Sequence, residues 1–315
     1  MKRLRLKPII IFVILLFITI VIIMDIKKLT PWYSDKPLDK NRIQSGNIEW
    51  MNYIRDSIDI RELSIPGTHD SCASDMLNPS IILWFVNDLY KCQSWSIEEQ
   101  LFAGIRYFDL RPAGNGIIYH GFGKTRYSMK SVFKIFHNFL NEHQSEGLIV
   151  RIQFSFKKYG DNLEKSKEKE IFQVLENYND ILYTDNDFPT VRKLRKKILV
   201  ILDKLEYRNL LTWENKDLIK IQDYYSLYGI KKLTLDKKSK LVKKYMYNND
   251  QSKLIINHCS GVGRGILSTI GYVAYTVNKI PYKEIGFRGI LIFDFPGEDL
   301  INHVINQNKP FFKLS

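Results

Sequence analysis

The chain has 315 residues, of which 45% are hydrophobic and 26% charged. These fractions are close to the averages of folded globular proteins, which excludes wholesale disorder, and 17 glycines and 10 prolines are too few for a collagen-like chain. Lysine and arginine outnumber aspartate and glutamate by 47 to 34, so the net charge is +13. That excess attracts lipid headgroups, wall polymers and nucleic acid alike, without selecting one of them.

Residues 1–28 are typical of a signal-anchor. Residues 8–24 contain no charged side chain, and basic residues flank them on both sides. A helix of this length spans roughly 25 Å, slightly less than a ~30 Å hydrocarbon core, and flanking lysines can cover the difference. Because no small-residue cleavage site follows, we expect an uncleaved transmembrane helix, with cleavage and secretion as the alternative. The N-terminal positive charge predicts an extracytoplasmic body.

Two further regions follow the anchor. Residues 29–48, with Pro31, Pro37 and Gly46, are typical of a juxtamembrane linker, and residues 49–315 are long enough for one large catalytic domain.

Short β-type segments alternate with helical segments from about residue 61 onward. The expected strands are 62–65, 105–110, 148–155, 197–202, 254–257 and 289–293. The expected helices are 97–103, 128–143, 163–177, 236–246, 265–278 and 298–307. This alternation predicts an α/β fold with a parallel sheet covered by helices, and the length favours a barrel over a small open sheet.

The cysteine content leaves the redox state open. Cys72, Cys92 and Cys259 are an odd number, so one disulfide with one thiol, or three thiols, are both compatible with the sequence. No C-x-x-C or H-E-x-x-H spacing occurs, so no structural zinc site is predicted.

Polar side chains that can carry chemistry follow several of the expected strands. They are His69 and Asp70 after the first strand, Asp109, Arg111 and His120 at and after the second, and Asp294 after the last. In α/β folds the carboxyl ends of the strands are where catalytic groups gather. The sequence therefore predicts one site built from these residues.

This set of side chains meets the needs of phosphodiester cleavage. One imidazole can take a proton from the attacking hydroxyl while another donates one to the leaving alkoxide. A guanidinium stabilises charge on the phosphoryl oxygens, and carboxylates orient the imidazoles. Taken singly, His69 is compatible with a capping role and Arg111 with a salt bridge to Asp109. Their joint position at strand ends favours a catalytic function.

Three motifs resemble the catalytic X domain of phosphatidylinositol-specific phospholipases C. They are Leu63-Ser-Ile-Pro-Gly-Thr-His-Asp-Ser71, Gln100-Leu-Phe-Ala-Gly-Ile-Arg-Tyr-Phe-Asp-Leu-Arg111 and Tyr119-His-Gly121, in the family's order and spacing. The resemblance is clear from about residue 60 to 156 and fainter to the end. It implies a distorted, incompletely closed TIM-type (β/α)8 barrel.

The resemblance also implies roles for the candidate residues. His69 would be the general base that activates the inositol 2-hydroxyl, and His120, assisted by Asp70, the general acid that protonates diacylglycerol. Arg111 would bind the phosphate oxygens. Asp109 would support the site and Asp294 would orient His69. The products would be diacylglycerol and inositol 1,2-cyclic phosphate.

The family's calcium-dependent branch has an acidic residue and a bound ion where Arg111 stands. A guanidinium there repels Ca²⁺, so we expect an enzyme that needs no metal and no cofactor.

Substrate contacts follow the family pattern less closely. Gln153 stands where the family usually has a lysine. Asp203 falls near the position of an arginine that is expected to contact the headgroup in the family. Asp223 and Tyr225 match the aspartate and the stacking tyrosine that bind the inositol ring. A turn carboxylate and a core aromatic are the structural alternatives for this pair.

Trp84 and Phe85 match a family segment that contacts membranes. Aromatic residues favour the lipid interface, so we expect these two to insert, with a buried helix as the alternative. Basic runs such as 193–197 would add attraction to an anionic membrane surface. No nucleic-acid-binding module is present, and the sequence carries no signal of oligomeric state.

The sequence thus predicts a metal-independent phosphatidylinositol-specific phospholipase C. One alternative is cleavage of another phosphodiester, such as a glycosylated inositol lipid or a glycerophosphodiester. The other is a catalytically silent lipid-binding module on the cell surface. A pure binder has no need of a base and an acid, so the paired histidines argue against it.

Overall fold

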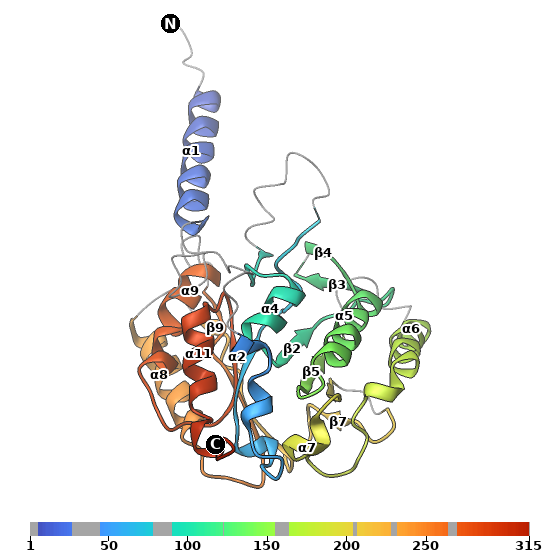
Figure 1. Ribbon diagram of the computed structural model, residues 1–315. Coiled ribbons are helices and arrows are strands. Elements are labelled where there is room, and N and C mark those ends of the chain that lie inside the picture. The colour runs from blue at the N-terminus through green and yellow to red at the C-terminus, as the bar shows by residue number, and fades with distance from the viewer. Residues whose placement is uncertain are drawn as a thin grey trace, which may run out of the picture.

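The centre of the computed structural model is a parallel sheet of eight strands (Figure 1). The structure describes residues 6–26, 45–77, 90–121, 123–154, 164–203, 207–227, 232–263 and 270–314. The strands, in spatial order, are β7 (Leu211–Thr212), β6 (Ile198–Leu202), β5 (Leu148–Ile152), β2 (Tyr107–Leu110), β1 (Ser64–Thr68), β12 (Gly289–Phe293), β10 (Leu254–His258) and β8 (Ile219–Gln222).

The sheet curls into a barrel with one break. The last strand of the chain, β12, pairs in parallel with the first, β1, from Ser64↔Gly289 to Thr68↔Phe293. Around the barrel, the strands of this sheet therefore follow one another in the order in which they occur in the chain. β7 and β8 are the two ends of the sheet and do not pair with each other. The expected incompletely closed barrel is therefore confirmed, and its opening lies between β7 and β8.

Continuous apolar runs explain the inner strands. All five residues of β6 and all five of β12 are buried. A strand buried on both faces is typical of a parallel sheet covered by helices. The expected strands at 105–110, 148–155, 197–202, 254–257 and 289–293 all form, with ends shifted by up to three residues, and the strand expected at 62–65 begins at Ser64.

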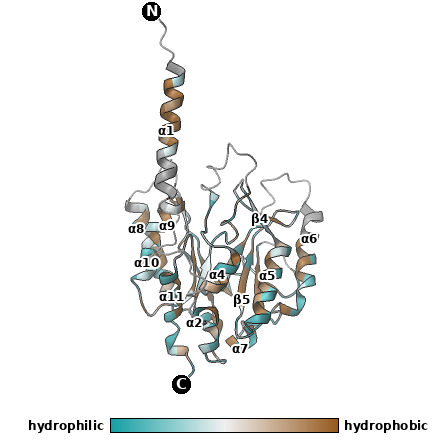
Figure 2. Ribbon diagram, turned by 45° about the horizontal axis from the view of Figure 1, so that its top comes forward, coloured by the Kyte–Doolittle hydropathy of each residue, from teal (hydrophilic) through white to brown (hydrophobic). Residues whose placement is uncertain are grey.

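Helices cover the outside of the barrel, and their outward sides are the more hydrophilic (Figure 2). The longer ones are α4 (Ile97–Ala103), α5 (Met129–Glu142), α6 (Glu164–Asn177), α8 (Lys232–Met246), α9 (Ile270–Val277) and α11 (Glu298–Asn306). The capping box at the start of α4 is confirmed, since Ser96 Oγ accepts from the backbone N–H of Glu99 at 3.1 Å. α4 ends at Ala103, and the residue that follows it, Gly104, has a φ of +103°, a conformation that favours glycine.

Several short strands were not expected from the sequence. β3 (Ile117–His120) and β4 (Gly123–Ser128) form an antiparallel hairpin after β2, and β9 (Ser226–Leu227) pairs with β11 (Val262–Gly263). The two-residue strands β9 and β11 contain too few positions for a periodic signal. The hairpin matters for the site because its first strand, β3, ends at His120.

The N-terminal helix α1 (Leu6–Ile26) has 21 residues. Within the described residues, no helix combines the length and apolar character that crossing a membrane requires. The transmembrane span expected at 8–24 is thus not found there. Further along, α2 (Ser45–Ile48) lies in the segment expected as a linker and contacts α4.

Candidate active site

His69 lies at the carboxyl end of β1, where the first and last strands of the barrel meet. Its backbone N–H donates to the carbonyl of Phe293 at 2.9 Å. The side-chain amide of Gln93 donates to the carbonyls of both His69, at 2.7 Å, and Phe293, at 3.0 Å. The next residue, Asp70, has a φ of +42°, a conformation uncommon for a non-glycine residue. These bonds and this turn fix the position of the His69 backbone.

The imidazole of His69 is oriented by Asp294. Nδ1 of the ring lies 2.9 Å from Oδ1 of the carboxylate, whose side chain is 1% exposed. The other carboxylate oxygen accepts from the backbone N–H of Gly261 at 3.3 Å. In the neutral ring Nδ1–H donates to Asp294, so the lone pair that a general base needs lies on Nε2.

The guanidinium of Arg111 connects His69 to two carboxylates. Nη2 lies 2.7 Å from Nε2 of His69 and 2.8 Å from Oδ2 of Asp109, and Nε lies 2.9 Å from Oδ1 of Asp70. Burial opposes ionisation of Asp109, but Arg111 and Arg151 outweigh it and hold the pKa of that carboxyl well below its usual range. Asp109 and Arg111 are therefore an ionised pair at neutral pH.

His120 faces the same space from the β3–β4 hairpin. Its Nδ1 lies 2.6 Å from the carbonyl of Tyr90, and its Nε2 lies 3.4 Å from Oδ2 of Asp70. The ring centroids of His69 and His120 are 6.4 Å apart, with the planes at 77°. Each histidine side chain is 17% exposed. Two imidazoles thus open onto one small volume, with Asp70 between them.

The pKa of His69 is raised above its ordinary value. Burial lowers it, but the neighbouring Asp70 and Asp294 carboxylates favour the protonated ring and outweigh both burial and the Arg111 charge. This raised pKa makes His69 a stronger base than a free imidazole.

Comparisons with known proteins agree with this geometry. Residues 63–204 match the family model described as "Phosphatidylinositol-specific phospholipase C, X domain". A 1-phosphatidylinositol phosphodiesterase from Listeria monocytogenes is 29% identical over 296 residues, covering 87% of this chain and 88% of the relative. The protein of the same name from Staphylococcus aureus strain NCTC 8325 is 23% identical over 337 residues, covering 93% and 98%.

Solved structures give the same result. The phosphatidylinositol-specific phospholipase C from Listeria monocytogenes superposes with a TM-score of 0.71 at 27% identity, covering 84% of this chain and 99% of that one. A Staphylococcus aureus phospholipase C at 20% identity and a TM-score of 0.67 shares the fold. The chain is thus similar to bacterial phosphatidylinositol-specific phospholipases C in both sequence and fold.

A second cation, Arg151 of β5, faces the site. Its Nη1 lies 3.6 Å from Oδ1 of Asp109, and its guanidinium carbon lies 3.6 Å from the centre of the Trp213 ring. Gln153 is two residues further on, so it points to the same face of the strand. Sequence reasoning aligned Gln153 with the family's lysine and missed Arg151. The sequence did contain a signal for Arg151, because it is the one charged residue in the apolar strand Leu148–Ile152. A charged side chain is rarely buried without a partner.

His258, at the end of β10, is another site residue that sequence reasoning missed. Its ring centroid lies 5.9 Å from that of His69 and 6.1 Å from that of Trp213. Burial lowers its pKa to about 3, so the ring is neutral at physiological pH. Its Nδ1 lies 3.2 Å from the hydroxyl of Ser260 and 4.0 Å from Oδ1 of Asp223.

Several buried polar atoms at this end of the barrel have no hydrogen-bond partner within the described part of the chain. They are Asp70 Oδ2, Asp109 Oδ1, Arg151 Nε, Gln153 Oε1 and His258 Nε2. Buried polar atoms are normally paired, and those that are not require an explanation. A ligand rich in hydroxyl groups and phosphate oxygens has the donors and acceptors to match them.

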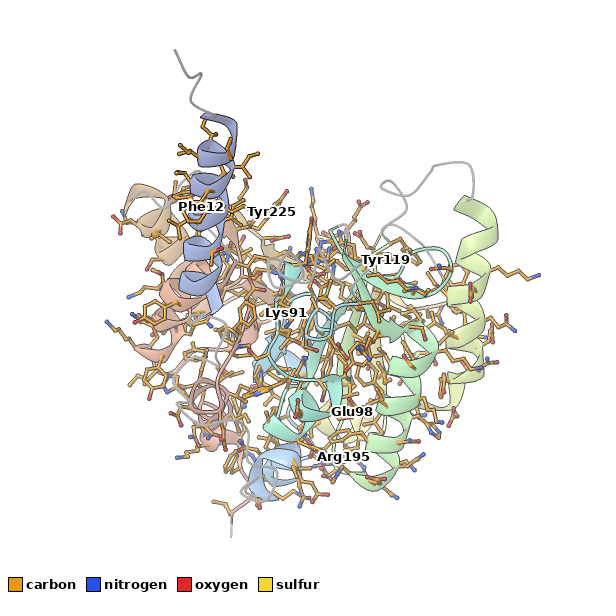
Figure 3. All side chains as sticks on the ribbon, turned by 90° about the horizontal axis from the view of Figure 1, so that it is seen from above. Phe12, Lys91, Glu98, Tyr119, Arg195 and Tyr225 are labelled. Atoms are coloured by element: carbon orange, nitrogen blue, oxygen red, sulfur yellow. The ribbon has the colours of Figure 1, made fainter. Side chains whose placement is uncertain are left out.

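The expected ring-binding residues lie at the edge of the same site. Asp223 follows β8, and its pKa is lowered because His258 and His69 outweigh the effect of burial. Tyr225 is 55% exposed, which disagrees with a core aromatic and fits an aromatic face that a sugar ring can cover. Figure 3 looks onto this end of the molecule, where the labelled Tyr225, Lys91 and Tyr119 come from three different segments.

Three further sequence expectations concern the surroundings of the site. Trp84 and Phe85 lie outside the described residues, so their membrane contact stays a prediction. Cys72, Cys92 and Cys259 are all buried free thiols, which selects the three-thiol alternative. Asp203, near the place of the family's headgroup arginine, follows β6 and is 8% exposed.

Proposed function

We propose that the protein is a metal-independent phosphatidylinositol-specific phospholipase C. The observation that carries the proposal is the pair of imidazoles 6.4 Å apart, one bonded to Asp294 and the other beside Asp70. Arg111 lies next to them, paired with Asp70 and Asp109. A base, an acid and a cation around one small volume are the groups that phosphodiester cleavage requires.

In the first part of the reaction, Nε2 of His69 takes the proton of the inositol 2-hydroxyl. The oxygen attacks phosphorus and forms a five-membered cyclic phosphodiester, so no water is consumed in this step. Asp294 accepts from Nδ1–H and stabilises the imidazolium that forms. Because its pKa is raised, His69 accepts this proton more readily than a free imidazole.

In the second part, the bond from phosphorus to the diacylglycerol oxygen breaks and His120 protonates that oxygen. Nδ1–H of His120 donates to the carbonyl of Tyr90, so the transferred proton comes from Nε2 of the protonated ring. Asp70, whose Oδ2 lies 3.4 Å from this nitrogen, helps to position the ring for the transfer. Proton exchange with solvent then returns both histidines to their starting states.

Arg111 supplies the positive charge that stabilises the phosphoryl oxygens. Asp109 and Asp70 hold the guanidinium in a fixed orientation, so little reorganisation is needed when negative charge develops. Since a fixed cation takes this role, we expect undiminished turnover in excess EDTA. A requirement for Ca²⁺ would contradict the metal-independent mechanism.

The test is phosphorus NMR on the full chain in detergent micelles containing phosphatidylinositol. A cyclic inositol phosphate signal is expected, because the five-membered cyclic ester has a distinctive chemical shift. His69→Ala should lower turnover by roughly 10²–10⁴-fold while lipid binding persists. The matched control is His137→Ala on the outer surface of α5. Cleavage of a glycerophosphodiester but not of phosphatidylinositol would replace the proposed substrate.

We also propose that the protein acts at an anionic membrane surface. The net charge of +13 supports this, because each basic residue near such a surface contributes about 1 kcal/mol of attraction. Sedimentation with vesicles of increasing anionic lipid content tests it. Binding that depends neither on anionic lipid nor on salt would contradict the electrostatic contribution.

A further inference from the structure

Lys238 is a buried lysine on the apolar side of α8. Its side chain is 0% exposed, whereas the adjacent Lys237 is exposed. Val242 and Met246 follow at intervals of four residues, so they lie on the same side of the helix, and both belong to an apolar cluster. Helical spacing therefore places Lys238 where an apolar residue is expected. A lysine is almost never fully buried without a partner, so this position requires an explanation.

The partner of Lys238 is the backbone of the segment 223–225, which joins β8 to β9. Nζ of Lys238 donates to the carbonyl oxygen of Tyr224 at 2.9 Å. The charged groups that act on the ammonium are the carboxylates of Asp223 and Asp294, and the thiol of Cys259 faces it from the end of β10. Burial lowers the pKa of Lys238 to about 8, so the side chain is mostly protonated at neutral pH. A charged donor makes a stronger hydrogen bond than a neutral one.

The backbone N–H of Tyr224 is held as well. It donates to Oε1 of Gln222 at 2.7 Å. Nε2 of Gln222 donates to Oδ1 of Asn257 and to the carbonyl of His258, both at 2.8 Å. Asn257 in turn donates to the carbonyl of Val242 in α8 at 2.9 Å. Buried side chains that are bonded to β10 and α8 thus hold both backbone groups of Tyr224.

Tyr224 lies between the two residues expected to contact the inositol ring. The side chain of Asp223 is 37% exposed and Tyr225 is 55% exposed, so their positions depend largely on the backbone that carries them. The carbonyl of Tyr225 is held by the backbone N–H of Val262 at 2.9 Å, where β11 pairs with β9. The remaining freedom of the segment is at Tyr224, which is the residue that Lys238 binds.

We propose that Lys238 is a positioning residue for the ring-binding side chains of Asp223 and Tyr225. It acts through the carbonyl of Tyr224 and takes no part in bond making or breaking. Headgroup binding therefore depends on Lys238, while proton transfer by the two histidines does not. The kinetic part of this proposal rests on the proposed function, and the part that concerns the backbone is independent of it.

The first test is hydrogen–deuterium exchange in the full-length protein without substrate. Lys238→Met keeps an unbranched side chain that packs among apolar neighbours, but the carbonyl of Tyr224 loses its donor. The amides of residues 223–227 should then exchange faster than in the wild type. The matched control is Lys237→Met, because Nζ of Lys237 lies 4.5 Å from the centre of the Tyr224 ring. Unchanged exchange in Lys238→Met, or equal acceleration in both variants, would overturn the proposal without reference to activity.

The second test is steady-state kinetics with phosphatidylinositol in micelles. KM should rise about 10-fold or more in Lys238→Met, since a hydrogen bond to a charged group such as Asp223 contributes roughly 10–100-fold to binding. kcat should stay near the wild-type value, because the lost contacts bind substrate and transition state alike. Lys237→Met should change neither constant. A fall in kcat at constant KM would overturn the positioning role.

A double-mutant cycle separates positioning from a general structural defect. In a protein that already carries Asp223→Ala and Tyr225→Ala, the further change Lys238→Met should leave KM as it was, because the side chains that Lys238 positions are gone. A second rise of the same size would overturn the proposal. If Lys238→Met does not fold, Lys238→Gln takes its place, because the shorter side chain ends before the carbonyl of Tyr224.

The two proposals can fail separately. Faster exchange of residues 223–227 in Lys238→Met, in a protein whose wild type cleaves no phosphatidylinositol, would refute the proposed reaction and support the role of Lys238 in holding the backbone. Cleavage by the wild type together with unchanged exchange and KM in Lys238→Met would support the reaction and overturn the role of Lys238.

Discussion

Oδ1 of Asp294 lies 2.9 Å from Nδ1 of His69, although 225 positions separate the two residues in the chain. The contact exists because β12 pairs with β1 in parallel and in register, so that both strands end at the same level. Closure of the barrel on this side therefore brings the imidazole of His69 and the carboxylate of Asp294 together. The break in the barrel lies elsewhere, between β7 and β8, and leaves this pair intact.

Replacing Asp294 with asparagine should reduce kcat far more than it reduces stability. The amide can present its N–H₂ group to Nδ1, which then places the ring proton on Nε2 and removes the base. We expect a loss of about 10²-fold or more, a large part of the roughly 10²–10⁴-fold that general acid–base catalysis contributes. Steady-state kinetics with phosphatidylinositol in micelles measures it. Asp236→Asn, on the exposed side of α8, is the control and should retain the wild-type rate.

The acid limb of the kcat/KM profile should lie above pH 6.5, the ordinary pKa of histidine. His69 acts as a base only when neutral, and its pKa is raised by Asp70 and Asp294 against the opposing effect of burial. Activity should therefore fall as pH drops through this raised value. Removing the charge of residue 294 should move the limb to lower pH in the residual activity of Asp294→Asn. A limb that stays in place, or moves upward, would mean that another group controls it.

Arg151 should determine how well the headgroup binds. Arg151→Met removes a cation that contacts both Asp109 and the face of Trp213, and a hydrogen bond to a charged partner is worth about 1.5–3 kcal/mol, or roughly 10–100-fold. We expect kcat/KM to fall by that factor, with a rise in KM. Arg151→Lys should recover part of the loss, because it keeps the charge without the planar stacking surface. Arg126→Met, an exposed change on β4, should have no effect on KM.

The buried ion pair between Arg106 and Glu146 should matter for stability. The two side chains are 1% and 0% exposed, and Nη2 lies 2.8 Å from Oε2. Arg106→Met leaves the Glu146 carboxylate without its partner in the core, so the free energy of unfolding should fall by about 3–5 kcal/mol. Urea denaturation followed by tryptophan fluorescence measures it.

Two comparisons separate charge burial from simple loss of contact. The double variant Arg106→Met/Glu146→Leu should be more stable than Arg106→Met alone, because it removes the unpaired charge. Breaking the exposed pair of Arg126 and Asp75 should cost at most about 1 kcal/mol. Equal effects at the buried and exposed pairs would contradict this account.

Local sequence signals predicted much of the framework. The capping box of Ser96 and Glu99 begins α4 where expected, because its bonds join residues three positions apart. The apolar positions of α5, including Phe133, Phe136 and Leu140, are buried as their helical spacing predicts. Both signals act within one or two turns of chain, so no knowledge of distant segments is needed. The incomplete closure of the barrel was expected only from the family resemblance, and the place of the break between β7 and β8 was not predicted.

The sequence by itself determined which chemical groups stand at the strand ends, because polar residues directly after apolar runs mark those ends. His69, Asp109, Arg111 and Asp294 were all found this way, and the structure brings them together. Only the tertiary structure decided that Arg151 contacts Asp109, that Cys92 adjoins His120 and that His258 adjoins His69. These contacts depend on strand register and on loops that cross the barrel end, which bring together residues 28 or more positions apart. Such long-range proximity is a property of the packed fold and leaves no local pattern in the chain.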